Sequence, residues 1–134
     1  MSTRQIKVTF PGNLKVMAEY QGFQILTDQP AYAGGDSAAP APFDLFLASL
    51  ATCAGYYVLA FCLQRGLSTE GIYLTMEMGK SPAAKLIEKI KINIHLPADF
   101  PDKYQEAVIR AADQCAVKLH ILNAPRFEIT TIKE

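Results

Sequence analysis

The sequence has no surplus of charge of either sign, because 13 Lys and Arg residues are balanced by 13 Asp and Glu residues. Proteins that bind nucleic acid or anionic membranes through charge carry an excess of basic residues. The balance therefore argues against a nucleic-acid partner. No glycine pattern resembles a phosphate-binding loop. The two histidines, His95 and His120, are not expected to gather with the cysteines. We therefore expect neither a metal nor an organic cofactor.

Cysteine is also scarce, with three residues in a chain of 134. The amino terminus alternates polar and apolar residues and shows no basic stretch followed by an apolar one, the pattern of a secretory leader. Three thiols without a leader do not indicate the disulfide framework of a secreted domain. We expect a cytoplasmic protein whose cysteines are reduced at rest or take part in redox catalysis.

Half of the residues are apolar, and the length suits one domain over residues 1–134. Short alternating segments bounded by Gly, Pro and Asn predict strands. The first three would form an antiparallel meander and the next two a hairpin. The predicted strands cover residues 4–10, 14–20, 22–28, 71–79, 86–96 and 126–134. A breaker-rich stretch at 28–42 predicts a loop without regular structure.

Two helices are predicted. The first begins at Pro42, has Asp44 at its positive end, and runs to about Leu63 with Gly66 as its stop. The second is predicted within residues 97–122 from apolar residues at helical spacing, and it would contain Cys115.

The first helix has 19 uncharged positions from Leu45, close to the length needed to cross a bilayer about 30 Å thick. Polar residues and two central tyrosines, Tyr56 and Tyr57, favour instead a core helix that covers the inner faces of the strands. One small sheet covers only one side of such a helix. A second subunit on the other side, most simply in a twofold dimer, would explain the lack of charge.

Cys53 and Cys62 lie nine positions apart on the predicted helix, so they face opposite sides and cannot bridge. Cys62, near the helix end among large apolar residues, is interpreted as a core residue. For Cys53 the spacing leaves two interpretations open, a small packing residue or a reactive thiol. A mid-helix thiol lacks the helix amino terminus that stabilises a thiolate, so a reactive Cys53 is expected to need a Lys or Arg from elsewhere.

Two segments in the same order resemble the OsmC/Ohr family of thiol-dependent hydroperoxide reductases. They are "GGDSAAPAPFDLFLASLATC", with Pro42 eleven residues before Cys53, and "LPADF…AVIRAADQCAV", which contains Cys115. The resemblance implies an α+β OsmC-like fold, in which antiparallel sheets wrap around long central helices in an intertwined homodimer. It is closest to a divergent OsmC-like subgroup.

The resemblance also implies a chemistry. Cys53 would be the peroxidatic thiol and Cys115 the resolving thiol. Cys53 would attack an organic hydroperoxide, form a sulfenic acid and condense with Cys115 to a disulfide. A lipoyl- or thioredoxin-like dithiol would reopen that bond, and neither a membrane nor a nucleic acid would take part.

The chain differs from the best-characterised members of the family around both thiols. A Glu is expected directly after the proline that begins the helix, but this position is Phe43 and the acid is Asp44. The Arg expected near the first strands is replaced by Lys15, which lacks the bidentate geometry of a guanidinium. The position after the second cysteine, often proline, is Ala116, and Lys118 stands where a hydroxyl is common.

These differences keep a second function open, from a different class. The protein would then be an OsmC-fold homodimer that binds a small apolar ligand and has little or no peroxidase activity. The reactivity of the Cys53 thiol distinguishes the two functions.

Overall fold

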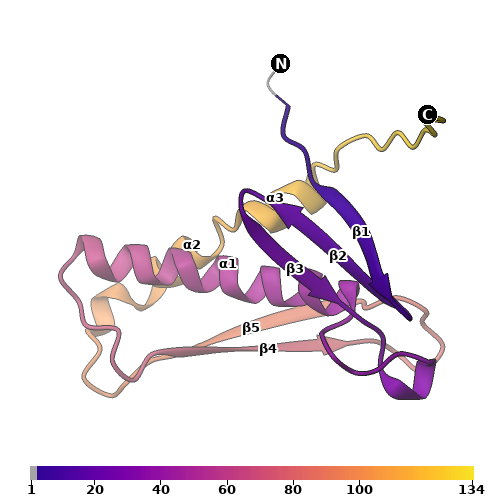
Figure 1. Cartoon of the computed structure of the whole chain (residues 1–134). Helices are drawn as coiled ribbons and strands as arrows, with labels where there is room; N and C mark the ends of the chain where they lie inside the picture. The colour runs from indigo at the N-terminus through magenta and orange to yellow at the C-terminus, as the bar shows by residue number, and fades with distance from the viewer. Residues whose placement is uncertain (1–2) are drawn as a thin grey trace. The chain divides into compact units, whose positions relative to one another are not determined.

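The computed structural model describes residues 3–134 and is shown in Figure 1. The chain forms two compact units, one ending at Ala48 and the other beginning at Ser49. Helices and antiparallel sheets are present together, so the predicted α+β class is confirmed. The prediction of a single domain stays a prediction.

The first unit contains a three-stranded antiparallel sheet in the order β1-β2-β3, as predicted. The strands are β1 (Lys7–Gly12), β2 (Lys15–Tyr20) and β3 (Phe23–Thr27). Tyr20 pairs with Phe23 across a two-residue turn, Gln21 and Gly22, in which both residues have positive φ. Two positive φ angles are typical of the tight turn whose twist matches a hairpin.

One face of this sheet is apolar. The registers place Val8, Ala18 and Ile25 in one row across the three strands, because Val8 pairs with Ala18 and Ala18 with Ile25. Val8 is 51% exposed and Ile25 is 41% exposed, and Phe23 on the same face is 69% exposed. Strand residues that alternate on a pleated sheet share a face, so this surface is a continuous apolar one that the single chain leaves largely uncovered.

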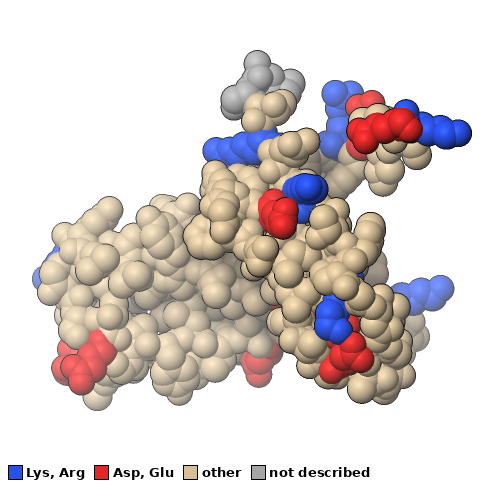
Figure 2. All heavy atoms as spheres, viewed as in Figure 1, with Lys and Arg blue, Asp and Glu red and all other residues tan. Residues whose placement is uncertain are grey.

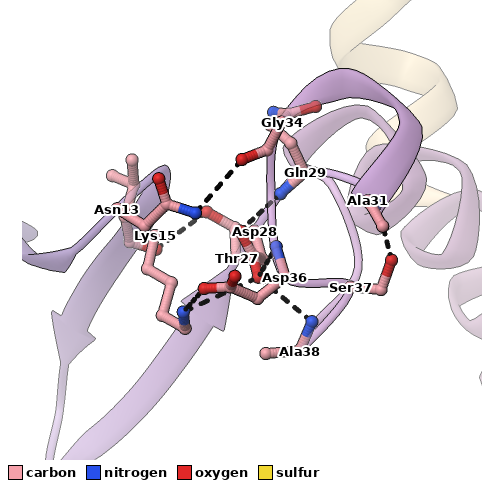
Figure 3. Close-up of polar contacts among 11 residues, drawn as sticks. Asn13, Lys15, Thr27, Asp28, Gln29, Ala31, Gly34, Asp36, Ser37 and Ala38 are labelled. Carbon is pink, nitrogen blue, oxygen red and sulfur yellow. Dashed lines mark hydrogen bonds and ion pairs between the residues drawn. The ribbon is translucent and has the colours of Figure 1, made fainter.

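The loop after β3 is held by a buried aspartate (Figure 3). The Asp28 carboxylate accepts hydrogen bonds from the backbone amides of Gln29, Asp36 and Ala38 at 2.7, 3.2 and 3.0 Å. These donors lower the pKa of Asp28, the Ala38 amide most strongly, while burial opposes them. Lys15 forms an ion pair with Asp36 at the same place. The loop is therefore closed by hydrogen bonds to a charged acceptor.

The loop also contains a short 3-10 helix, η1 (Ala31–Ala33), which the prediction of an irregular loop missed. It is stabilised by local bonds, since the amide of Ala31 donates to the Ser37 hydroxyl at 2.8 Å. Gly35 lies against the backbone of Gln29, and a Cβ atom at Gly35 would be 1.9 Å from the Gln29 carbonyl oxygen. A glycine is therefore required where the loop closes on itself.

The long helix α1 (Pro42–Gln64) agrees with the predicted helix at both ends. The Asp44 carboxylate accepts a hydrogen bond from the amide of Ala41 at 3.2 Å, at the positive end of the helix. Gly66, with φ of 64°, ends the helix in the left-handed conformation, and the amide of Leu67 returns to the carbonyl of Cys62 at 2.9 Å. This return bond is that of a Schellman motif.

In the second unit, β4 (Tyr73–Gly79) and β5 (Lys89–His95) form the predicted antiparallel hairpin, with Tyr73 opposite His95 and Gly79 opposite Lys89. The core lies between this hairpin, α1 and the helix that follows. The buried residues of the cluster are Val58, Phe61, Cys62, Phe100 and Val108. Burying an aliphatic or aromatic side chain of this size contributes about 1.5–3 kcal/mol.

Helix α1 buries one stripe in this core and leaves another exposed. Its buried residues are Leu50, Ala54, Val58, Phe61 and Cys62. Tyr56, Leu59 and Leu63 are 61%, 42% and 69% exposed, and they share a face by helical spacing. By length and hydropathy α1 would also pass as a membrane-crossing helix. The stripe buried against the hairpin and the following helix favours the core-helix interpretation.

The prediction of one helix around Cys115 is wrong. Two helices, α2 (Gln105–Ala112) and α3 (Ala116–Leu122), follow a 3-10 turn, η2 (Asp102–Tyr104). Cys115 lies between them in a non-helical conformation, with φ of −48° and ψ of 118°. The apolar spacing continued across the gap, but Asp113 ends α2 and Cys115 takes the N-cap position of α3.

The predicted last strand, residues 126–134, is also not formed, because residues 123–134 have no regular structure in this single chain. Its apolar residues are exposed, with Phe127 at 85%, Ile129 at 94% and Ile132 at 85%. A strand needs a neighbouring strand for its backbone hydrogen bonds, and none of the described strands pairs with this segment.

Candidate functional site

The three cysteines have different surroundings, and all three are free thiols. Cys62 is fully buried in the core, and burial raises its pKa while Arg65 opposes this. A buried thiol with a raised pKa is inert, as predicted for a packing residue. Cys53, on the same helix, is half-buried. It does not belong to the buried core cluster that contains Cys62.

Cys53 and Cys115 share a hydrogen bond between their side chains, so the fold brings together two residues that are 62 positions apart. Cys115 is positioned by the α2–α3 junction, where its sulfur accepts a hydrogen bond from the amide of Lys118 at 3.4 Å. The sequence predicted both cysteines as a functional pair only through the family resemblance, since the spacing could not show that α1 meets the junction.

The pKa of Cys53 is lowered from its ordinary value, chiefly by a hydrogen bond from the backbone of Val117. Burial opposes this, and the Cys115 thiol and the backbone of Ala116 add further hydrogen bonds that lower the pKa. Hydrogen bonds to the charged form favour the thiolate. The donors come from the first turn of α3, where the backbone amides have no partner within the helix.

The pKa of Cys115 moves in the opposite direction. Burial raises it most, the amide of Lys118 opposes this, and the neighbouring Cys53 sulfur raises it further. The surroundings therefore push the two pKa values apart. Cys53 is the easier of the two thiols to ionise, and the Cys115 thiol is the donor of the hydrogen bond between them.

The Lys or Arg that a reactive Cys53 was expected to need is not among the groups that shift the pKa of this thiol in the described residues. The groups that lower it are two backbone amides and a thiol. The helix that contains Cys53 has no free amides at this position, whereas the amino terminus of a different helix supplies the donors. Ala116 and Val117 were thus missed as functional residues. The sequence held one signal that a helix ends before Cys115, namely the polar pair Asp113 and Gln114 directly before the cysteine.

A groove of about 880 Å³ is lined by Cys115 and by residues of α1 near Cys53 in the sequence. It lies within the second unit, and its apolar walls include Leu50 and Ala54 of α1, Ile92 of β5, and Val108 of α2. Cys115 lines it together with Asp113, the C-cap residue of α2, and Lys118 of α3. A concave, mostly apolar site beside groups with shifted pKa values is the usual form of a small-molecule site.

No group of His, Cys, Asp and Glu residues suited to a metal occurs among residues 3–134. His95 lies on the polar face of the hairpin, as predicted, where it hydrogen-bonds Thr75 at 2.8 Å and stacks on Tyr73. The His120 ring contacts the carbonyl of Ala116 at 2.6 Å on α3. Figure 2 shows basic and acidic residues scattered over the face in view, without a patch of one sign.

Comparison with known proteins points to one family. A family profile described as "OsmC-like protein" matches residues 34–130, a range that includes both Cys53 and Cys115. A search of the curated proteins gave no match.

Several solved structures share the fold. A protein from Psychrobacter arcticus, described in terms of osmotic stress induction and detoxification response, is 24% identical with a TM-score of 0.71, and 87% of each chain is covered. A protein from Aquifex aeolicus is 14% identical with a TM-score of 0.67, covering 92% of this chain and 90% of its own. An organic hydroperoxide resistance protein OsmC from Legionella pneumophila is 18% identical with a TM-score of 0.57, and 90% of each chain is covered. The fold and the family profile agree, and the chain belongs to the OsmC-like protein family.

Proposed function

We propose that the protein is a thiol-dependent peroxidase that reduces organic hydroperoxides in defence against oxidative stress, with Cys53 as the peroxidatic thiol and Cys115 as the resolving thiol. One observation carries this proposal: the two thiols share a hydrogen bond and their pKa values shift in opposite directions. A lowered thiol pKa provides the nucleophile, and the neighbouring thiol is in place to capture the oxidised sulfur.

In the first step, the Cys53 thiolate attacks the outer oxygen of the peroxide. A sulfur–oxygen bond forms, the oxygen–oxygen bond breaks, and the departing alkoxide takes a proton from solvent to become the alcohol. The backbone amides of Ala116 and Val117 stabilise the thiolate before the attack.

In the second step, the Cys115 sulfur attacks the sulfur of the Cys53 sulfenic acid. The disulfide forms, and the hydroxyl leaves as water together with the thiol proton of Cys115. A dithiol reductant then supplies two electrons and two protons, so that both thiols are restored and the reductant itself becomes a disulfide.

The apolar groove supports an organic substrate over hydrogen peroxide. An alkyl group that enters it gains about 0.8 kcal/mol for each buried CH₂. The groove walls on α1 are Leu50 and Ala54, which directly flank the Cys53 turn of the helix. A series of alkyl hydroperoxides of increasing length should therefore show kcat/KM values that rise with length.

The direct test treats reduced protein with one equivalent of cumene hydroperoxide and maps disulfides by mass spectrometry. We expect a Cys53–Cys115 bridge, while Cys62 remains a free thiol. In the Cys115→Ser variant we expect Cys53 to accumulate as sulfenic acid, which dimedone would label. Unreacted thiols in the wild-type protein would refute the proposal.

A second candidate function is favoured by the groove itself, whose volume of about 880 Å³ suits a small apolar ligand. In this case the protein would bind the ligand and turn over peroxide poorly. The rate of alkylation by iodoacetamide as a function of pH separates the two. A Cys53 pKa near or below 7 supports catalysis, and a pKa above about 8.5, the value of a free cysteine, supports binding alone.

We also propose that the working form is a homodimer. The exposed stripe of α1 at Tyr56, Leu59 and Leu63 and the uncovered apolar face of the β1–β3 sheet both need a cover. A second copy of the chain is the simplest one, because a twofold interface uses the same patch on both subunits. Light scattering at micromolar concentration should give twice the monomer mass, and a monomer would contradict this.

A further inference from the structure

The α2–α3 junction directs three successive backbone amides at two sulfurs. The backbone of Ala116 hydrogen-bonds to Cys53, that of Val117 to both Cys53 and Cys115, and the amide of Lys118 donates to Cys115. These amides have no partner within α3, so their direction depends on how α3 is set against the end of α2.

Few packing contacts hold α3 in this orientation. Helix α3 has seven residues, and none of them is buried. A helix this short is unstable by itself, since helix formation has a costly nucleus. The residue that anchors the junction in the interior is Cys115, which is 4% exposed.

One side-chain interaction spans the junction. The Lys118 ammonium forms an ion pair with the carboxylate of Asp113. Asp113 is the C-cap residue of α2, and its amide donates to the carbonyl of Ile109 at 3.0 Å. Lys118 belongs to the first turn of α3. The pair therefore connects the last turn of α2 to the first turn of α3, across Cys115.

We propose that Asp113 and Lys118 are positioning residues for the proposed peroxidatic thiol: their ion pair sets α3 so that its first amides face Cys53. The inference rests on the proposed function, but it concerns the thiol before any peroxide arrives. In this proposal Lys118 acts by orienting α3 through its ion pair, and not by its charge on the sulfur. No charge interaction of Lys118 with the Cys53 sulfur is among the causes that shift the Cys53 pKa.

The experiment measures the rate at which iodoacetamide alkylates Cys53 as a function of pH, in a series of variants. Lys118→Met and Asp113→Asn each remove the pair. Lys118→Arg keeps it, and the double variant Asp113→Lys with Lys118→Asp reverses it. Reversal places a base at the end of α2 and an acid at the start of α3, which both helix dipoles favour. Lys91→Met, on the exposed face of β5, is the matched control.

We expect both pair-breaking variants to raise the Cys53 pKa and to slow alkylation at pH 7 by about three- to tenfold, within the range for an ion pair and one charge-assisted hydrogen bond. The Arg variant, the reversed pair and the Lys91 control should follow the wild-type profile.

Two results would overturn the inference. A Lys118→Met profile identical to the wild type would show that the ion pair does not orient the amides of α3. A reversed pair that raises the Cys53 pKa as Lys118→Met does would show that the lysine acts by its charge. Neither result depends on peroxide, so the proposed peroxidase function can stand or fail separately. Circular dichroism of each variant checks that α2 and α3 are retained, and the Arg and reversed variants keep the test valid if a pair-breaking variant unfolds.

Discussion

Oxidation of Cys53 and Cys115 to a disulfide should stabilise the protein by an amount that depends on the number of residues between them. A bridge between residues 62 positions apart removes loop-closure entropy from the unfolded chain. The chain-entropy relation gives about 4 kcal/mol at 25 °C for a loop of this length. For a chain of 134 residues, this corresponds to a rise in Tm of about 10–15 °C.

The full gain requires that the native structure is not strained when the bond forms. The two side chains already share a hydrogen bond, and although Cys53 lies in the middle of α1, Cys115 occupies an N-cap and so lies outside the regular part of α3. We therefore expect the two sulfurs to join with little backbone movement. Urea unfolding followed by far-UV circular dichroism, on reduced and oxidised protein at equal concentration, measures the difference.

The control is Cys115→Ser, which cannot form the bridge and should show the same stability after either treatment. Mass spectrometry must first confirm the bridge in the oxidised wild type. A confirmed bridge that adds less than about 1 kcal/mol to the free energy of unfolding, or that lowers it, would contradict this prediction. The junction would then have to move before the sulfurs could meet, and native-state strain would cancel the entropic gain.

Three further predictions concern single positions. Ala116→Pro removes one backbone amide but keeps a backbone suited to proline at the first helical position. Cys53 should then be alkylated more slowly at pH 7, while the free energy of unfolding changes by less than about 1 kcal/mol. Alkylation at an equal or faster rate would contradict the role of this amide. Gly35→Ala places a Cβ 1.9 Å from the Gln29 carbonyl oxygen and should lower the free energy of unfolding by about 3 kcal/mol or more. Gly55→Ala has open space around a helical site and should raise it by about 0.5–1 kcal/mol, as measured by urea unfolding. The pKa of Asp28 is lowered in the folded state, so its contribution to stability is present above the unfolded pKa of about 3.9 and is lost as the pH falls through the folded pKa. The urea midpoint should therefore drop on acidification more steeply in the wild type than in Asp28→Asn.

Most of the fold followed from local patterns. The first three strands and the β4–β5 hairpin alternate clearly and are separated by turn residues. Helix α1 carries its own start and stop signals, Pro42 with Asp44 and Gly66. In each case the interactions that decide the structure lie within a few residues of one another, so periodicity and capping chemistry suffice.

The errors arose where distant residues decide. The apolar spacing through Cys115 fits one helix, but the cysteine is buried and its amide neighbours face α1, so the chain breaks at the junction. Residues 126–134 have the alternation of a strand but no neighbour among the described strands. The pairing of Cys53 with Cys115 likewise depends on how α1 meets the junction, which spacing along the chain does not encode.

The use of backbone amides at Cys53 has a consequence for how freely the chain can vary. A thiolate held by a charged side chain is lost when that one residue changes, but every residue except proline supplies the same amide. Positions 116 and 117 can therefore accept many side chains without loss of the donors, provided that the turn is kept. The selective constraint then falls on backbone shape and not on residue identity, so a family member can lack the acid and the arginine expected near its thiol and still keep the donors that lower the pKa of that thiol.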